Sequence, residues 1–432
     1  MRLAPCILLA AIGGAVCAQP QPIQLPSRGS FYTDPSTGNR VWRVTDAQLC
    51  PGGAFHYYSY WPVWNRDSSL LLVACHRGRS QEAILLRGAD FSEVKTNLRG
   101  PALNPQRFFW SWTDANVAYA QNPSEIWRWE PLRGKGSRIV GLPNEKVGGL
   151  DVHHIRLAYV SFDDRYLLIE WQGPNRARGR QNEWDVLAIA VFDLQTKKYV
   201  SQLDVSQWSY YDEAVFTKDN HVWVVGDKES FVYDLALSTR TRIADHGHHA
   251  HGLLPDGTAV TAKAASNQSC PGGSKAGSPK DEGYPAQGWK PTALLLKDLT
   301  PVDSKGAGPF PAELFRLGCR MPGKHDFSHF SWNNEQRDRF FVSTWGYGGF
   351  ADDPLANAIL RVRLGFDSAG KIISDDMEVL AHHRSENRGY YASPRASCNQ
   401  QGTRCLFAST MTVATDNTNS QPQLYVVDVP QK

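Results

Sequence analysis

Short apolar alternations separated by turns built on Asp, Asn or Gly recur along the whole chain. A clear example is the apolar segment 157–162, which is followed by the turn 163–165 and a second apolar segment, 166–170. Alternation with a period of two residues is typical of half-buried β-strands. No stretch has an apolar stripe at helical spacing over three turns. The pattern therefore predicts an all-β protein.

Seven such modules follow one another, spaced roughly 40 to 80 residues apart, which is the super-period of a β-propeller. They begin near residues 58, 108, 157, 214, 249, 329 and 391. The competing fold, a β-sandwich, would show turns every 8–12 residues or so without this super-period. The last module lacks an outer strand, and segment 31–44 can supply it. We therefore predict a seven-bladed β-propeller closed by an N-terminal strand that completes the last blade.

The first eighteen residues have the pattern of a secretory signal peptide. Arg2 is followed by the apolar segment 7–16 and then by small residues ending at Ala18. The apolar segment is too short to cross a bilayer. We expect cleavage near Ala18, a secreted or periplasmic protein with no membrane association, and one monomeric domain over residues 19–432. A Gly/Pro/Ser-rich insertion at about 264–292 interrupts the fifth module.

The cysteines fit an oxidising compartment. Six remain after removal of the signal peptide, and fifteen pairings of six cysteines are conceivable. Cys398 and Cys405 flank a hairpin tip and should pair with each other. Closeness in sequence then favours two further bonds, Cys50–Cys75 and Cys270–Cys319. A zinc site is the alternative, but the chain contains no Cys-x-x-Cys pair.

We expect no nucleic-acid partner, because the charge is balanced, with 46 basic and 43 acidic residues. In a propeller, the innermost strand of every blade starts on the same face, so residues at these starts surround the channel. Most of the thirteen histidines lie in or beside this ring. The candidate site residues at these positions are His56, Arg107, His154, Tyr210, His249, His329, Arg388, Tyr390 and Arg395.

Segment 246–251 contains four histidines. His249 and His251 are two residues apart, so on a strand they share a face and could ligate one ion. His325 from the next blade could complete the set for a divalent cation such as Mn, Ca or Zn. Direct catalysis by these histidines, or neither role, are the alternatives.

The ring is poor in carboxylates, with Asp212, Glu213 and Asp326 as the near candidates. Glycoside hydrolysis by paired carboxylates is therefore disfavoured. The chain also lacks a Gly-x-Ser-x-Gly elbow and a phosphate-binding glycine loop. Histidine, tyrosine and arginine together suit β-elimination on a uronic acid polymer. A neutral histidine or a deprotonated tyrosine removes the C5 proton, a tyrosine or histidine protonates O4, and an arginine or cation neutralises the carboxylate.

Three segments carry a resemblance to a known family. Residues 34–45 are similar to the N-terminal segment of oligogalacturonate lyases, and 251–257 resembles their blade opening, in which a metal-ligand histidine precedes Pro-Asp-Gly. Residues 329–332 are similar to another of their histidine-led inner strands. The chain thus resembles the TolB-like propellers and, among them, the oligogalacturonate lyases. The resemblance implies an acidic polysaccharide or oligosaccharide as substrate and manganese as cofactor.

Residues 388–395 depart from that family, whose members carry glutamine and histidine ligands there. This difference moves the expectation toward a site of the ulvan lyase kind, in which histidine, tyrosine and arginine act on the same face of a seven-bladed propeller.

We accordingly predict a polysaccharide lyase with His249 or His329 as base, Tyr390 as acid, and Arg388 or Arg395 on the carboxylate. His56, Arg107, His154 and Tyr210 would bind substrate. The alternatives are a non-catalytic periplasmic propeller that binds a protein or envelope glycan, and a metal-dependent hydrolase.

Overall fold

The computed structural model describes residues 23–77, 80–95, 98, 108–174, 185–226, 229–245, 248–264, 293–296, 313–316, 325–346, 355–385, 392–411 and 421–431. Within these ranges, only the backbone is described for 80, 242–245, 264, 293–296, 313–316, 325–326 and 346. The signal peptide, most of the predicted insertion and the Cys270–Cys319 pair therefore lie outside the described residues. No helix in the described chain has the length and hydropathy needed to cross a membrane.

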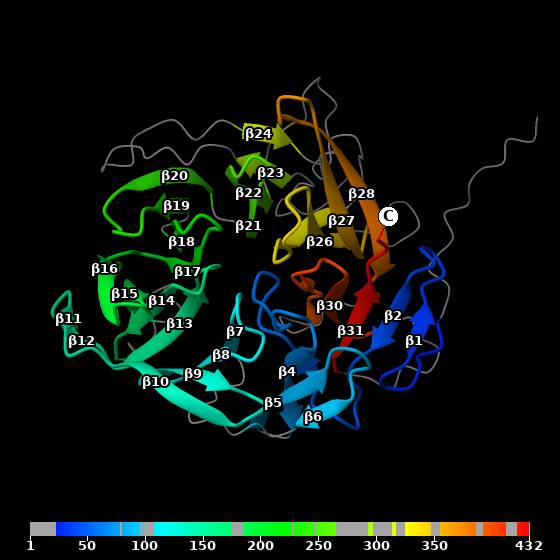
Figure 1. Cartoon of the computed structure of the whole chain (residues 1–432), viewed down its shortest axis with the longest axis horizontal. Coiled ribbons are helices and arrows are strands. Elements are labelled where there is room, and N and C mark those ends of the chain that lie inside the picture. The colour runs from blue at the N-terminus through cyan, green and yellow to red at the C-terminus, as the bar shows by residue number, and fades with distance from the viewer. Residues whose placement is uncertain are drawn as a thin grey trace, which may run out of the picture.

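Six consecutive segments each form a four-stranded antiparallel sheet, and these blades follow one another around a ring (Figure 1). Blade 1 comprises β3 (Ala54–Phe55), β4 (Leu70–Arg77), β5 (Ser80–Arg87) and β6 (Glu93–Lys95). Blade 2 comprises β7 (Phe108–Trp110), β8 (Ala118–Asn122), β9 (Glu125–Glu130) and β10 (Lys135–Gly141). Blade 3 comprises β13 (His154–Val160), β14 (Tyr166–Gln172), β15 (Val186–Asp193) and β16 (Lys198–Asp204).

The next three blades repeat this order. Blade 4 comprises β17 (Tyr211–Phe216), β18 (Val222–Gly226), β19 (Glu229–Tyr233) and β20 (Arg240–Asp245). Blade 5 comprises β21 (His249–Leu253), β22 (Ala259–Ala264), β23 (Ala293–Leu296) and β24 (Glu313–Arg316). Blade 6 comprises β25 (His325–Ser331), β26 (Arg339–Gly346), β27 (Ala358–Phe366) and β28 (Ile372–His382). A small hairpin, β11 (Lys146–Val147) and β12 (Leu150–Asp151), separates blades 2 and 3.

A seventh, five-stranded sheet closes the ring, with strand order β1-β2-β31-β30-β29. Its strands are β1 (Phe31–Thr33), β2 (Arg40–Arg43), β29 (Ser397–Cys398), β30 (Arg404–Ser409) and β31 (Gln423–Asp428). Strand β2 pairs with β31, with Val41 opposite Val427, and Figure 1 shows the blue and red ends of the chain side by side. The predicted closure is confirmed. The N-terminal segment contributes two strands rather than one, because 31–33 and 40–43 form a hairpin.

The middle strands of the blades are buried on both faces, because each blade packs between two neighbours. All eight residues of β15 are buried, whereas the outer strand β16 alternates between exposed and half-buried positions. Strands covered on both faces have near-continuous apolar sequences. The clear alternation thus belongs to the outer strand, and the apolar segments of the sequence mark the middle of each blade.

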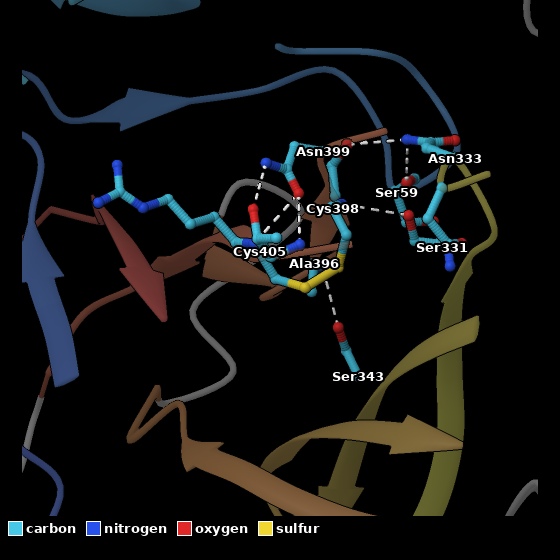
Figure 2. The surroundings of a disulfide bond; sticks show 12 residues. Ser59, Ser331, Asn333, Ser343, Ala396, Cys398, Asn399 and Cys405 are labelled. Atoms are coloured by element: carbon cyan, nitrogen blue, oxygen red, sulfur yellow. Dashed lines mark hydrogen bonds between the residues drawn. A yellow bond between two sulfur atoms is a disulfide. The ribbon is translucent and has the colours of Figure 1, made fainter. Parts of the chain in front are cut away.

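Both predicted disulfides within the described residues are present. Cys50 is bonded to Cys75, and Cys398 is bonded to Cys405. Figure 2 shows the second bond at the junction of blade 6 and the closing sheet. There the backbone N–H of Ala396 donates to Ser343 Oγ at 2.8 Å, and the backbone N–H of Cys398 donates to Ser331 Oγ at 3.3 Å. The bond therefore fixes the short inner strand β29 where it meets the neighbouring blade.

Gly252 in β21 allows blades 5 and 6 to approach closely. A Cβ atom at this position would lie 2.3 Å from ring atoms of the buried Trp332. We expect Gly252→Ala to destabilise the fold by about 1–3 kcal/mol, because the packed indole must shift. Gly141→Ala is the matched control, since its Cβ would meet nothing closer than 3.9 Å. Urea unfolding measures the difference, and equal midpoints for the two variants would contradict this packing.

Candidate functional site

A loop of blade 1 enters the channel. Phe55 pairs with Ala74, and Trp64 forms a bridge with Leu71. Between these two pairings the inner segment advances by nine residues while β4 advances by three. The extra residues lie within 56–62, which we name the channel loop. It consists of His56, two tyrosines, Ser59, Tyr60, Trp61 and Pro62. The loop replaces an ordinary inner strand with a set of ring side chains near the axis of the propeller.

Contacts from five other sheets hold the channel loop. Tyr159 of blade 3 donates its hydroxyl to Tyr60 O at 2.8 Å, and Trp61 lies 5.1 Å from Phe109 of blade 2 between ring centroids. Further contacts come from blades 5 and 6 and from the closing sheet. Tyr60 stacks on His249 with ring centroids 5.7 Å apart. Asn333 Nδ2 donates to Ser59 O at 3.3 Å, and Ser397 Oγ donates to Trp61 O at 2.8 Å. The loop therefore fills the channel and divides it into two mouths.

Five side chains meet on one side of this loop, and we name them the mouth cluster: His56, Tyr58, His248, His329 and Arg395. The rings of His248 and His329 stack at 4.1 Å with an interplanar angle of 24°. Tyr58 lies edge-on to both, at 6.0 Å from His248 and 5.3 Å from His329. Blades 1, 5 and 6 thus bring two imidazoles and a phenol together.

Arg395 supplies the positive charge of the mouth cluster. It is 1% exposed, its Nη1 donates to Tyr57 O at 3.2 Å, and its Cζ lies 6.0 Å from the Tyr58 ring centroid. Burial, together with the charges of His248, Arg395 and His56, holds the pKa of His329 well below its usual range. Ser328 Oγ lies 2.8 Å from its Nδ1. In the tautomer whose Nδ1–H donates to this oxygen, Nε2 has the lone pair that can accept a proton. At neutral pH His329 is therefore an unprotonated imidazole beside a cation.

Burial, followed by the charge of Arg395, lowers the pKa of His56 to about 3. His56 is 3% exposed. A neutral buried histidine stabilises the fold fully above its unfolded pKa of 6.5, and that contribution is lost as pH falls toward the folded value. The protein should therefore lose stability in acid through this residue.

In the unmodified protein, His56 should lower the free energy of unfolding by about 1.4 kcal/mol for each pH unit below 6.5. We expect His56→Gln to abolish this part of the decline. His221→Gln is the control. The neighbouring Asp219 carboxylate raises the pKa of His221, so its contribution has the opposite sign and grows in acid. Urea melts from pH 7 to about 4 measure both slopes. Identical slopes in His56→Gln and the unmodified protein would show that His56 is not held neutral.

A second group adjoins the mouth cluster on blades 4 and 5. Glu213 Oε1 lies 3.7 Å from His249 Nδ1, and burial raises the pKa of this carboxyl to about 8. His249 packs against Trp223, with ring centroids 4.8 Å apart. At neutral pH Glu213 is mostly protonated, so it can donate a proton or a hydrogen bond where an ordinary glutamate cannot.

Behind the channel loop lies a buried ionic network between blades 3 and 4. Arg156 is ion-paired with Glu170, and both side chains are almost completely buried. Tyr211 donates its hydroxyl to the other oxygen of Glu170 at 2.7 Å. Both oxygens of this carboxylate thus have a partner inside the protein, and we assign the network a structural role.

The predicted metal site is not supported. His249 and His251 share a strand face, as expected, but that face packs on Trp223 in the interface of blades 4 and 5. His251 Nδ1 is 2.9 Å from Thr261 Oγ1, and the side chain of His325 lies outside the described residues. Among the side chains that are described, no group of three or more His, Cys, Asp or Glu could hold a metal ion.

Four of the predicted substrate-binding residues lie among the described ones, and their role toward a substrate stays a prediction. His56 and Arg395 are buried, at 3% and 1% exposed, and so is His329, at 7%. His154 is exposed at the start of β13, and Tyr210 is half-buried just before β17, on the face where the inner strands begin. Arg107, Arg388 and Tyr390 lie outside the described residues. Of the two bases predicted, His329 lies in the mouth cluster and His249 adjoins it.

Sequence reasoning missed Tyr58 and did not distinguish His248 from its neighbours. Tyr58 belongs to an apparent strand, 58–64, and only the mismatch in pairing with β4 shows that this segment is a loop. The run Tyr57-Tyr58-Ser59-Tyr60 was the available signal, because a strand would place alternate tyrosines in the blade interior.

Two solved structures are similar to the chain over nearly its whole length. One is an oligogalacturonate lyase in complex with manganese, with 16% identity, a TM-score of 0.58, and coverage of 96% of this chain and 99% of the other. The second is an oligogalacturonate lyase from Vibrio parahaemolyticus, with 14% identity, a TM-score of 0.57 and the same coverage. The shared feature is the propeller fold. No protein-family model matches the chain, and no curated protein sequence matches it.

Proposed function

We propose that the protein is a lyase that cleaves a uronic-acid-containing polysaccharide or oligosaccharide by β-elimination. The observation that carries the proposal is the state of His329, a neutral imidazole held against His248 and Tyr58 with a buried cation nearby. A base that is unprotonated at neutral pH, beside a phenol and a positive charge, has the components that such an elimination needs. The similarity in fold to oligogalacturonate lyases supports the proposal of a lyase.

In this proposal His329 Nε2 takes the proton from C5 of the uronate. The electron pair of the C5–H bond forms the C4=C5 double bond, and the C4–O4 bond breaks. The Tyr58 hydroxyl gives its proton to the departing O4. The proton on His329 then passes to solvent, and Tyr58 regains one, so the enzyme returns to its starting state.

Arg395 stabilises the negative charge that develops on the uronate carboxylate when C5 loses its proton. Because the guanidinium is buried behind Tyr58, it acts through its field in a medium of low dielectric rather than by a direct contact. His154 and Tyr210, on the same face, are the described candidates for binding the flanking sugars. No step in this scheme depends on a metal ion.

The test is an assay of the mature protein with polygalacturonate, alginate and a glucuronan, with a neutral galactan as control. We expect ultraviolet absorbance from the conjugated C4=C5 product to rise with at least one acidic polymer and not with the neutral one. Absence of any rise with all three acidic polymers would contradict the proposal and favour a non-catalytic binding role.

We also propose that the protein works outside the cytoplasm. The Cys50–Cys75 and Cys398–Cys405 bonds support this, because disulfides persist in oxidising compartments. Edman sequencing of the exported protein should give Gln19 as the first residue if cleavage follows Ala18.

A further inference from the structure

A second pocket opens on the other side of the channel loop. It has a volume of about 360 Å³, which is within the size range of small-molecule sites. Its walls come from the turns that follow the inner strands, and every sheet of the ring contributes at least one residue. Inner strands start at the mouth cluster and end here, so the pocket lies at the opposite mouth of the propeller.

The channel loop separates this pocket from the mouth cluster. Asn333, which lines the pocket, donates its Nδ2 to Ser59 O at 3.3 Å and to Trp61 O at 3.4 Å. Figure 2 shows Asn333 reaching Ser59 in this way. Gln400 lies beside the turn that contains Asn333, with its backbone O accepting from Glu335 N at 2.8 Å. The side-chain Nε2 of Gln400 donates to Trp112 O at 3.2 Å. The walls are thus held in place by buried amides before any ligand arrives.

The charges in the pocket are unbalanced. Arg66, Lys218 and Arg337 face one carboxylate, Glu335, which is paired with Arg66 at 2.7 Å. Lys218 Nζ donates to Asn334 O at 2.7 Å, and in the described part of the chain no carboxylate lies within ion-pair distance of it. One ammonium group therefore points into the pocket with donors left over, since Nζ carries three protons.

The remaining wall beside Lys218 is apolar. The rings of Trp112 and Phe162 stack at 4.5 Å, and Lys218 Nζ lies 5.3 Å from the Phe162 ring centroid. With Glu335 paired to Arg66, Lys218 and Arg337 are the unbalanced cations of the described lining, and Lys218 is the one beside aromatic carbon. This wall suits a ligand with a negative charge next to an apolar or weakly polar body.

We propose that this pocket binds a small organic carboxylate, of about monosaccharide size, with the Lys218 ammonium as its counter-ion and its body against Trp112 and Phe162. The site is independent of the proposed lyase reaction, because the channel loop separates the two mouths. Burial, assisted by the charge of Arg337 and opposed by that of Glu335, lowers the pKa of Lys218 to about 7. Carboxylate binding should therefore weaken as pH rises above 7, when the free amine predominates.

Isothermal titration with acetate, benzoate and galacturonate tests the site, with galactose and inorganic phosphate as comparison ligands. We expect at least one carboxylate to bind at pH 6.5, and binding to weaken by about ten-fold per pH unit above 7. Lys218→Met should weaken it at least ten-fold, whereas Lys218→Arg should keep binding up to pH 9 because a guanidinium stays charged. Lys371→Met, at an exposed hairpin, is the matched control.

The His329→Gln variant separates the two mouths. Carboxylate binding that persists in His329→Gln and is lost in Lys218→Met supports the proposal. The opposite pattern would place the ligand at the mouth cluster and overturn it. Absence of heat with all three carboxylates, or equal affinity in Lys218→Met and the unmodified protein, would overturn it as well. Unchanged melting of Lys218→Met shows that a loss of binding is not a loss of fold.

Discussion

The His329→Gln variant should cleave acidic polysaccharide about 10²- to 10⁴-fold more slowly than the unmodified protein, which is the usual contribution of a positioned general base. Glutamine fills a similar volume and can still hydrogen-bond to Ser328, so the pocket keeps its shape. It cannot accept the C5 proton. Initial rates of double-bond formation measure the loss, and circular dichroism together with thermal melting checks the fold.

His221→Gln is the matched control for this experiment, because it removes a histidine from blade 4 that is paired with Asp219 and lies away from the mouth cluster. Its rate should equal that of the unmodified protein. Equal rates for His329→Gln and His221→Gln would remove His329 from the reaction. Glu213 and His249 would then become the groups to test, because they form the neighbouring acid–base pair.

The largest effect on stability is expected from Glu170→Ala. This change leaves the guanidinium of Arg156 in the protein interior without its carboxylate and removes the acceptor of the Tyr211 hydroxyl. Breaking a buried ion pair from one side costs about 3–5 kcal/mol of unfolding free energy, because a charge remains buried and uncompensated. The shift of the urea midpoint reports the loss.

Two further variants should lose less stability than Glu170→Ala. Tyr211→Phe removes only the hydroxyl and should cost about 1.5–3 kcal/mol, the range for a hydrogen bond to a charged group. Asp376→Ala breaks the Arg363–Asp376 pair, whose carboxylate is 63% exposed, and should cost less than about 1 kcal/mol. Similar losses for Glu170→Ala and Asp376→Ala would mean that water reaches the Arg156–Glu170 pair.

The propeller could be predicted from the sequence because its repeat is a packing requirement. Each blade needs apolar middle strands and a polar turn, and these recur in every module, as β14 and β15 show for blade 3. Closure was predictable because the last module lacks an outer strand, which the strand pattern of residues 31–44 can supply. That two strands rather than one come from this end depends on the hairpin between β1 and β2, whose six-residue connection the apolar pattern does not reveal.

The site was less predictable, because it depends on which way single side chains point. His248 and His249 are neighbours, yet one stacks on His329 and the other packs against Trp223. Their roles follow from the register of β21, which begins at His249. The channel loop is a local departure from the blade pattern, so the regularity that predicted the fold concealed Tyr58. The burial of Arg395 could not be predicted, because a sequence shows the charge of a side chain but not its exposure.

The central claim is that the protein breaks glycosidic bonds by elimination, and the masses of its products test this most directly. A purified uronate oligosaccharide of defined length should be incubated with the protein and analysed by mass spectrometry. Elimination predicts that the masses of the two fragments sum to the mass of the substrate, with the fragment from the new non-reducing end one water lighter than the corresponding free sugar. Fragments that together carry one additional water would show hydrolysis, and an unchanged substrate would show no cleavage; either result would contradict the account.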